Sequence, residues 1–182
     1  MPEWIQQFDW SVLHWIRDTL TCGVTDLLMP KITLLGNGGA VWLAAAVAML
    51  LSKRYRKFGI TLLLALAAGA LVGNVWLKHW LARPRPCWLE NVPLLIKNPT
   101  DYSVPSGHTL SSVIGACVLT GANRRFALAA IPLAVLIGIS RLFLYVHFPS
   151  DVLAAALLGT AIGTAAVLIA KRTNGKKLPD TP

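Results

Sequence analysis

The stretch that follows Asp151 reads VLAAALLGTAIGTAAVLIA and covers Val152–Ala170 without a charged side chain. A helix needs roughly 20 predominantly apolar residues to cross the hydrocarbon core of a bilayer. The stretch therefore predicts a membrane-spanning helix that begins beside Asp151 and ends before Lys171.

Four further apolar runs of similar character precede it, at residues 32–51, 58–77, 106–122 and 126–146. Hydrophobic residues make up 55% of the 182-residue chain and charged residues 14%, with a mean hydropathy of +0.58. A soluble domain is usually less apolar and carries about 25% charged residues. We therefore predict an all-α integral membrane bundle of five transmembrane helices, forming one domain over residues 32–170.

The segment 1–31 differs in character, because Trp4, Phe8 and Trp15 alternate there with polar residues. This pattern predicts an amphipathic helix in the outer interface, with tryptophans at headgroup level. A sixth span over residues 10–29 is the alternative, although it would place four ionisable residues in the membrane. The segment lacks the basic start and apolar core of a signal peptide, so we expect the first run to act as an uncleaved insertion signal.

The net charge of +9 is concentrated on one side of the predicted bundle. Seven basic residues are balanced by seven acidic ones, and ten others, with one acid, follow the first, third and fifth runs. The positive-inside rule places these segments and the tail 171–182 in the cytoplasm. The N-terminus, the loop 78–105 and the turn at His147 then lie outside. A nucleic-acid surface would interleave basic and aromatic residues, so we expect no nucleic-acid partner.

Three cysteines, Cys22, Cys87 and Cys117, are too far apart for a paired metal motif. Cys22 and Cys87 both fall outside, where a disulfide could persist, but two free thiols are the preferred interpretation. Glycine pairs at helical spacing predict close helix packing within the chain, with a homodimer face as the alternative. The pairs are Gly69/Gly73 and Gly159/Gly163.

The last turn before the fifth run carries the first chemical signal. His147 and Asp151 are four residues apart, so the carboxylate can reach one imidazole nitrogen and leave the other free to attack. Pro149 lies between them, so the contact is expected to cross a junction between a loop and a helix. The plainer alternative is that Asp151 caps the following helix.

A second signal opens the third run, where Ser106, Gly107 and His108 follow a proline. Free amide groups at a helix start favour an anion, and glycine lets a phosphate oxygen approach the backbone. His108 would transfer protons. Taken alone, this motif also suits a simple helix cap with an incidental histidine.

Three cations approach the same face: Lys78, Arg85 and Arg141. Arginine binds phosphate through two parallel hydrogen bonds, and lysine adds a compact charge. Snorkelling to the headgroups would account for one lysine but not for three cations beside two histidines. Two histidines and an aspartate could also ligate a metal, but three cations would repel a divalent ion. We therefore expect an anionic substrate, no metal and no cofactor.

Together these motifs resemble the three signatures of the type 2 phosphatidic acid phosphatase superfamily, which also includes vanadium haloperoxidases and bacterial acid phosphatases. The motifs are Lys78-x6-Arg85-Pro86, Pro105-Ser106-Gly107-His108 and Ser140-Arg141-x5-His147-x3-Asp151. The resemblance spans about residues 30–170. Family members often have six spans, whereas five are predicted here.

The resemblance implies metal-independent phosphate hydrolysis through a phosphohistidine. By it, His147 attacks phosphorus, Asp151 orients His147, and His108 protonates the leaving oxygen and then activates water. The implied phosphate ligands are Lys78, Arg85, Ser106, Gly107 and Arg141.

The substrate is expected to be a phosphorylated membrane lipid in the inner (cytoplasmic) membrane of a bacterium. We favour undecaprenyl pyrophosphate, because the site faces outward, where that carrier is released. Phosphatidylglycerol phosphate, phosphatidic acid and lipid A phosphate are the alternatives. A lipid-to-lipid phosphotransferase is the alternative of another class. Transport is disfavoured, because the ionisable residues gather at one face.

Overall fold

The computed structural model describes residues 2–175, with side chains as far as residue 172. Every regular element in this part of the chain is helical, as predicted. The predicted tail beyond residue 175 lies outside the described residues. The elements are α1 (Glu3–Leu20), α2 (Gly23–Leu35), the 3₁₀ turn η1 (Asn37–Gly39), α3 (Ala40–Leu51), α4 (Arg56–Gly69), the π-helical η2 (Ala70–Leu77), α5 (Lys78–Leu81), α6 (Pro86–Leu89), α7 (Gly107–Ala122), the 3₁₀ turn η3 (Arg124–Phe126), α8 (Ala127–Phe143) and α9 (Pro149–Gly175).

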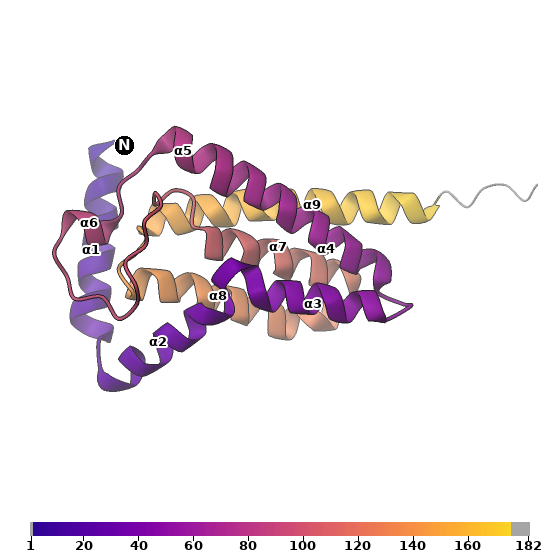
Figure 1. The fold of residues 1–182 in the computed structure, drawn as a ribbon, viewed down its shortest axis with the longest axis horizontal. Helices are drawn as coiled ribbons and strands as arrows, with labels where there is room; N and C mark the ends of the chain where they lie inside the picture. Colours follow the sequence, from indigo (N-terminus) through magenta and orange to yellow (C-terminus); the bar gives the residue numbers. More distant parts are fainter. Residues whose placement is uncertain (1, 176–182) are drawn as a thin grey trace, which may run out of the picture.

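The long helices run side by side, and α7 is their centre (Figure 1). It packs against α4, α8 and α9, and its buried side chains Leu110, Ile114 and Val118 form the middle of the apolar core. Both predicted glycine pairs face this helix. A Cβ added at Gly73 would lie 2.3 Å from Leu110, and one at Gly163 would lie 2.6 Å from Cys117. The glycines therefore allow close packing within the chain.

The first apolar run, residues 32–51, is not the single helix that we predict. It breaks at Gly36–Gly39, and the axes of α2 and α3 differ by 44°. Gly38 and Gly39 have φ angles of +58° and +71°, which non-glycine residues rarely adopt. The sequence Gly-Asn-Gly-Gly has low helix propensity throughout, which explains why the helix ends there.

Among the described residues, three helical stretches are long and apolar enough to cross a membrane: Arg56–Leu89, Arg124–Phe143 and Pro149–Arg172. If the bent pair α2–α3 is counted as one span, the described residues contain four candidate spans. The helix α7 is apolar but shorter. The number of five spans therefore stays a prediction.

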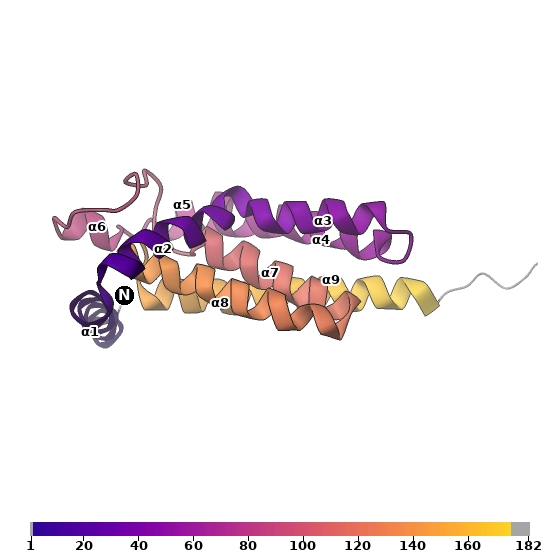
Figure 2. The same cartoon turned by 90° about the horizontal axis from the view of Figure 1, so that it is seen from below.

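The N-terminal helix α1 lies across one end of the bundle, as both views show (Figures 1 and 2). Its face toward the bundle buries Leu13, which packs with Tyr145 and Phe148. Trp10 meets the Phe148 ring edge-on at 5.0 Å. The aromatic residues Trp4, Phe8 and Trp15 stay exposed, as an interfacial helix would require.

The loop between the second and third apolar runs starts later than we predict. Helix continues through η2 and α5 to Leu81, so residue 78 lies on a helix and not in the loop 78–105. The reason is that Lys78 and its neighbours have no helix breaker before Pro84. The rest of the loop passes over the end of the bundle and contains only α6 (Figure 1). All three cysteines are free.

Candidate active site

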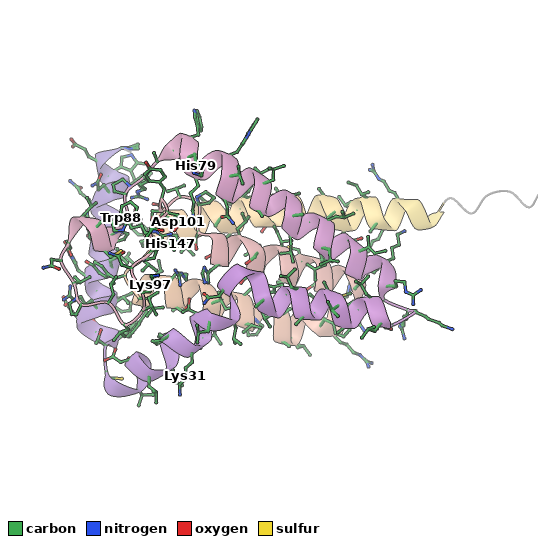
Figure 3. The ribbon with its side chains drawn as sticks, viewed as in Figure 1. Lys31, His79, Trp88, Lys97, Asp101 and His147 are labelled. Carbon is green, nitrogen blue, oxygen red and sulfur yellow. The ribbon has the colours of Figure 1, made fainter. Side chains whose placement is uncertain are left out.

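Three buried cations meet beneath the loop, each from a different element. Lys78 begins α5, Arg85 precedes α6, and Arg141 lies in the last turn of α8. All three line one cavity of about 1020 Å³ together with Gly107, His108 and His147. Figure 3 shows Asp101 and His147 at this end of the bundle. The structure therefore brings most of the predicted site residues together.

His147 is 1% exposed, and its Nε2 atom lies 3.1 Å from Arg85 Nη1. A guanidinium only donates hydrogen bonds, so Nε2 must accept with its lone pair, which leaves the proton on Nδ1. Burial and the positive charges of Arg85 and Arg141 lower the pKa of His147 well below its usual value. The imidazole is therefore neutral at neutral pH, with an unprotonated Nε2 whose lone pair accepts the Arg85 hydrogen bond.

The predicted contact of His147 with Asp151 runs through a third residue. Nδ1 lies 3.8 Å from Asp151 Oδ2, which is too far for a hydrogen bond. Ser103 Oγ lies between them, donating to Asp151 Oδ2 at 2.5 Å and lying 3.4 Å from Nδ1. The same Oδ2 accepts the Phe148 amide at 2.8 Å, so Asp151 also caps α9. Orientation and capping are thus compatible.

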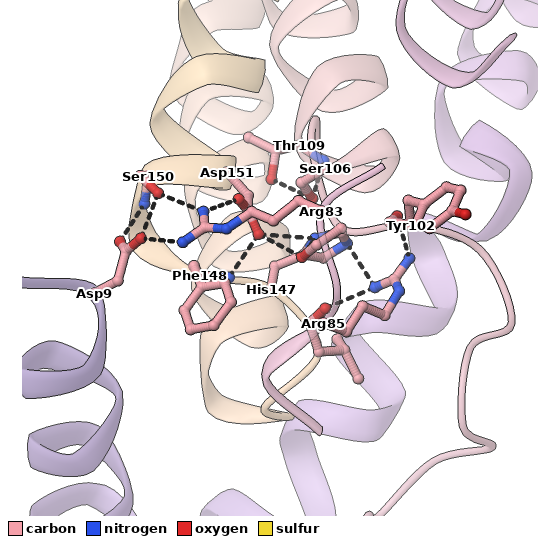
Figure 4. A network of polar contacts seen from close by, with 12 residues as sticks. Asp9, Arg83, Arg85, Tyr102, Ser106, Thr109, His147, Phe148, Ser150 and Asp151 are labelled. Carbon is pink, nitrogen blue, oxygen red and sulfur yellow. Dashed lines mark hydrogen bonds and ion pairs between the residues drawn. The ribbon is translucent and has the colours of Figure 1, made fainter. Parts of the chain in front are cut away.

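The other Asp151 oxygen is bound by Arg83, a residue that we did not predict and whose side chain is 10% exposed. Arg83 donates to Asp151 Oδ1 at 2.5 Å and to Asp9 Oδ2 at 2.7 Å (Figure 4). Its guanidinium lies 4.0 Å from the Phe148 ring centroid. Asp9 also accepts the Ser150 amide at 2.9 Å and the Ser150 hydroxyl at 2.5 Å. A carboxylate on α1 is therefore part of the support of Asp151.

A weak signal for this network exists in the sequence. Asp9 shares one helix face with Leu13 and Ile16, so it is an acidic residue on the apolar face of α1. Such a residue needs a buried partner. Nothing in the sequence near Asp9 identifies Arg83, which is 74 positions away.

Asp101, from the loop, binds two of the three cations. Lys78 Nζ donates to Oδ2, and Arg85 Nη2 donates to Oδ1 at 2.7 Å. Burial alone would raise the pKa of Asp101, but the Lys78 hydrogen bond and the Arg85 charge outweigh it and lower the pKa to about 2. Arg141 instead donates from Nη1 to Thr33 Oγ1 at 2.6 Å. Its buried Nε has no hydrogen-bond partner within the described residues.

At the start of α7, His108 and Gly107 line the cavity, whereas Ser106 caps the helix. His108 Nε2 lies 2.8 Å from Asn37 Oδ1, and both residues line the cavity. Gly107 also lines it, and a Cβ there would lie 2.9 Å from Asn74 Oδ1. Ser106 is fully buried as the N-cap and accepts the Thr109 hydroxyl at 3.1 Å. Its side chain thus serves the helix, and it is not among the cavity-lining residues.

Metal ligands are a separate question. In residues 2–175 we find no group of three or more His, Cys, Asp or Glu side chains placed to hold an ion. The expectation of a metal-independent reaction stays a prediction.

The model of the PAP2 superfamily matches residues 58–174, which contain all three motifs. The chain belongs to this superfamily. It is 38% identical over 141 residues to undecaprenyl-diphosphatase of Sulfolobus acidocaldarius, covering 76% of this chain and 68% of that protein. It is 31% identical over 165 residues to phosphatidylglycerophosphatase B of Bacillus subtilis, covering 80% of this chain and 70% of that protein. The chain is therefore a phosphatase.

The fold has a solved counterpart. The structure of the transmembrane PAP2-type phosphatidylglycerolphosphate phosphatase from Bacillus subtilis superposes with a TM-score of 0.74 at 24% identity, covering 97% of this chain and 89% of that one. The likeness extends beyond the family segment to α1, α2 and α3. The protein is a multi-pass membrane protein of this PAP2 fold.

Proposed function

We propose that the chain hydrolyses a lipid phosphate or pyrophosphate at the outer leaflet through a phosphohistidine on His147. The observation that carries the proposal is the unprotonated Nε2 of His147 at the wall of a cavity with three cations, where a phosphoryl group would take over the hydrogen bond from Arg85. Arg141 Nε adds a buried donor without a partner in the described chain. An anion with several acceptor oxygens, such as a phosphoryl group, matches this set of donors.

The reaction follows from these positions. His147 Nε2 attacks phosphorus while the bond from phosphorus to the lipid oxygen breaks, and His108 donates a proton to that oxygen. Lys78, Arg85 and Arg141 offset the charge that develops on the phosphoryl oxygens. His108 then takes a proton from water, which attacks the phosphohistidine and releases inorganic phosphate. Ser103 and Asp151 hold the Nδ1 proton throughout.

The cavity also supports a lipid as the leaving group. Away from the cations its walls become apolar, with side chains from α2, α3, α4 and α7. These include Leu34, Leu43, Leu66 and Ile114. A prenyl or acyl chain fits such walls better than water does. The name of the Sulfolobus relative favours undecaprenyl pyrophosphate as the substrate, and that of the Bacillus relative keeps phosphatidylglycerol phosphate as the second candidate.

The outer location is proposed from the charge distribution. The α3–α4 connection with Lys53 and Arg54 lies at the end of the bundle opposite the loop, as does the C-terminal part of α9 (Figure 1). In intact cells, and with the three native cysteines replaced by serine, a membrane-impermeant thiol reagent should label Leu95→Cys, in the loop, and not Lys53→Cys. The reverse labelling would place the site in the cytoplasm.

The activity is tested with purified protein in detergent and a panel of four lipids: undecaprenyl pyrophosphate, phosphatidylglycerol phosphate, phosphatidic acid and lipid A. Release of inorganic phosphate should be fastest from the first, without a lipid acceptor and without loss in chelator. Release that requires a lipid acceptor would indicate a phosphotransferase. Loss in chelator that a divalent ion restores would indicate a metal enzyme. No release from any lipid would refute the proposal.

A further inference from the structure

The break in the first apolar run places a side chain in the cavity. Asn37 is the first residue of η1, between α2 and α3, and its Oδ1 atom lies 2.8 Å from His108 Nε2. Within the described residues this is the only hydrogen bond to the His108 imidazole. Non-helical backbone at membrane depth is tolerated where it lines a cavity, and this break does so.

The backbone around Asn37 fits closely against His108. A Cβ at Gly36 would lie 2.8 Å from His108 Cδ2, which real contacts do not show. Gly39, in the left-handed region, faces Ser111 in the next turn of α7. The break is thus packed against the first two turns of α7, and only glycine allows the approach at position 36.

The chemistry of an amide suits a proton-transfer partner. The Asn37 oxygen accepts the Nε2 proton of His108, so Nδ1 is the nitrogen that exchanges a proton: it takes one from the phosphate group of the substrate, which binds as the monoanion, and passes it to the leaving oxygen. An amide fixes the ring without adding charge, whereas a carboxylate would hold the imidazolium form. The charged groups that surround His108 already include Lys78, Arg85, Arg141 and Asp101, and His147 is the other titratable neighbour.

We propose that Asn37 is a positioning residue that fixes the ring and tautomer of His108 for proton transfer to the leaving oxygen. The inference rests on the proposed function. It concerns a residue outside the segment 58–174 that the family model matches. Nothing in the three motifs identifies Asn37, because it acts through His108 and contacts no other motif residue.

The test uses leaving groups that differ in their need for a proton. Asn37→Leu removes the amide at similar size, and Asn37→Asp keeps an oxygen acceptor. Phosphatidic acid has an alkyl leaving group that requires protonation, and p-nitrophenyl phosphate does not. We expect Asn37→Leu to lower kcat on phosphatidic acid about 10- to 100-fold, but to lower the rate of protein phosphorylation by p-nitrophenyl phosphate less than about threefold, like a weaker His108→Ala. Asn37→Asp keeps the acceptor oxygen but adds a charge, so it should lower the activity on phosphatidic acid less than Asn37→Leu does.

A matched control is Asn123→Leu, because the Asn123 amide donates to Tyr55 Oη at 3.1 Å near the other end of α7. This variant should leave both substrates unaffected. An equal loss on both substrates in Asn37→Leu, or no loss, would overturn the inference.

A measurement without turnover separates this inference from the proposed function. In protein labelled with ¹⁵N-histidine, His108 should give the signals of an Nε2–H tautomer, and Asn37→Leu should change these signals selectively. An unchanged His108 signal would overturn the inference. If the wild-type protein released no phosphate at all, the proposed function would fail while this measurement still decided the Asn37 contact.

Discussion

The two histidines of the site share one cavity but are held in different ways. His147 is almost completely buried and fixed on both ring nitrogens, by Arg85 on one side and by Ser103 with its carboxylate partner on the other. His108 is half-buried, and Asn37 supplies its one hydrogen bond within the described chain. The support of the first comes from several segments, including α1, whereas that of the second comes from a helix break.

This difference matches the two roles that we propose. A nucleophile has to meet phosphorus at one distance and along one line, so any freedom lowers the rate. A general acid and base has to serve two oxygens in succession, first that of the lipid and then that of water. Substitutions around His147 should therefore lower the rate on every substrate. Substitutions around His108 should lower the rate of lipid release most for substrates whose leaving oxygen needs a proton.

The largest effect is expected at the nucleophile itself. His147→Ala should reduce phosphate release from every substrate to background, a loss of more than about 10⁴-fold, because no other side chain can form the covalent intermediate. Quantifying ³²P that stays on the protein after an alkaline quench and is lost in acid tests the intermediate directly. His79→Ala, which removes an exposed imidazole on α5, should keep full activity. Turnover by His147→Ala would remove the assignment.

A smaller and selective effect is expected at His108. His108→Ala should lower kcat by about 10²–10⁴-fold on alkyl phosphates, the usual contribution of general acid catalysis. The rate of protein phosphorylation by p-nitrophenyl phosphate should change little, while the release of inorganic phosphate slows. Rapid-quench measurement of both steps checks this. Equal losses on both steps and all substrates would show that the two histidines do not differ as we propose.

Removing the bridge beside His147 should have an intermediate effect. Ser103→Ala deletes the hydroxyl between Asp151 and Nδ1, and a buried hydrogen bond contributes about 1–3 kcal/mol, which corresponds to a loss of roughly 5- to 150-fold in kcat on all substrates. Ser103→Thr should recover part of the rate. Ser11→Ala, an exposed hydroxyl on α1, is the control. An effect limited to alkyl phosphates would assign Ser103 to the His108 side.

The smallest effect is expected at the carboxylate that binds the cations. Asp101→Asn should lower KM, and the inhibition constant of inorganic phosphate, by about three- to tenfold, because the carboxylate competes with phosphate for Lys78 and Arg85. Steady-state kinetics with phosphatidic acid and with p-nitrophenyl phosphate would show this. A raised KM would mean that Asp101 organises the cations for the substrate.

The lowered pKa of Asp101, about 2 against an ordinary value of 3.8, adds a pH signature. A carboxyl group with a lowered folded-state pKa stabilises the protein above its unfolded-state value and loses that contribution as the pH falls toward 2. Because the Asp101 side chain is 56% exposed, the contribution is small. The melting temperatures of wild type and Asp101→Asn should therefore converge between pH 4 and pH 2.

Much of this arrangement is local in sequence and was predictable. The apolar runs determine the helical bundle, and the family resemblance, which the comparison confirms, relies on residues within three short motifs. The glycines of Gly-Asn-Gly-Gly indicate a helix break. A prediction that considers only the hydrophobicity of residues 32–51 misses this break. Its function depends on His108, which lies 71 positions away.

The support of Asp151 could not be predicted in the same way. Ser103 appears as an ordinary loop serine, and Arg83 as one more basic residue beside two prolines. Asp9 and Arg83 become partners only when α1 lies across the end of the bundle, a contact that depends on packing between Trp10 and Phe148. Contacts between distant segments leave no periodic pattern in either segment.

Arg141 Nε has no hydrogen-bond partner among residues 2–175, and this has a thermodynamic consequence. A buried donor without an acceptor costs about 1–3 kcal/mol, so an oxyanion that accepts it recovers free energy only in the folded protein. Inorganic phosphate or vanadate should therefore raise the melting temperature in proportion to the logarithm of its concentration above Kd, even though neither has a lipid chain. Because an oxyanion would accept the hydrogen of Arg141 Nε, the melting temperature of this membrane protein would directly measure oxyanion binding.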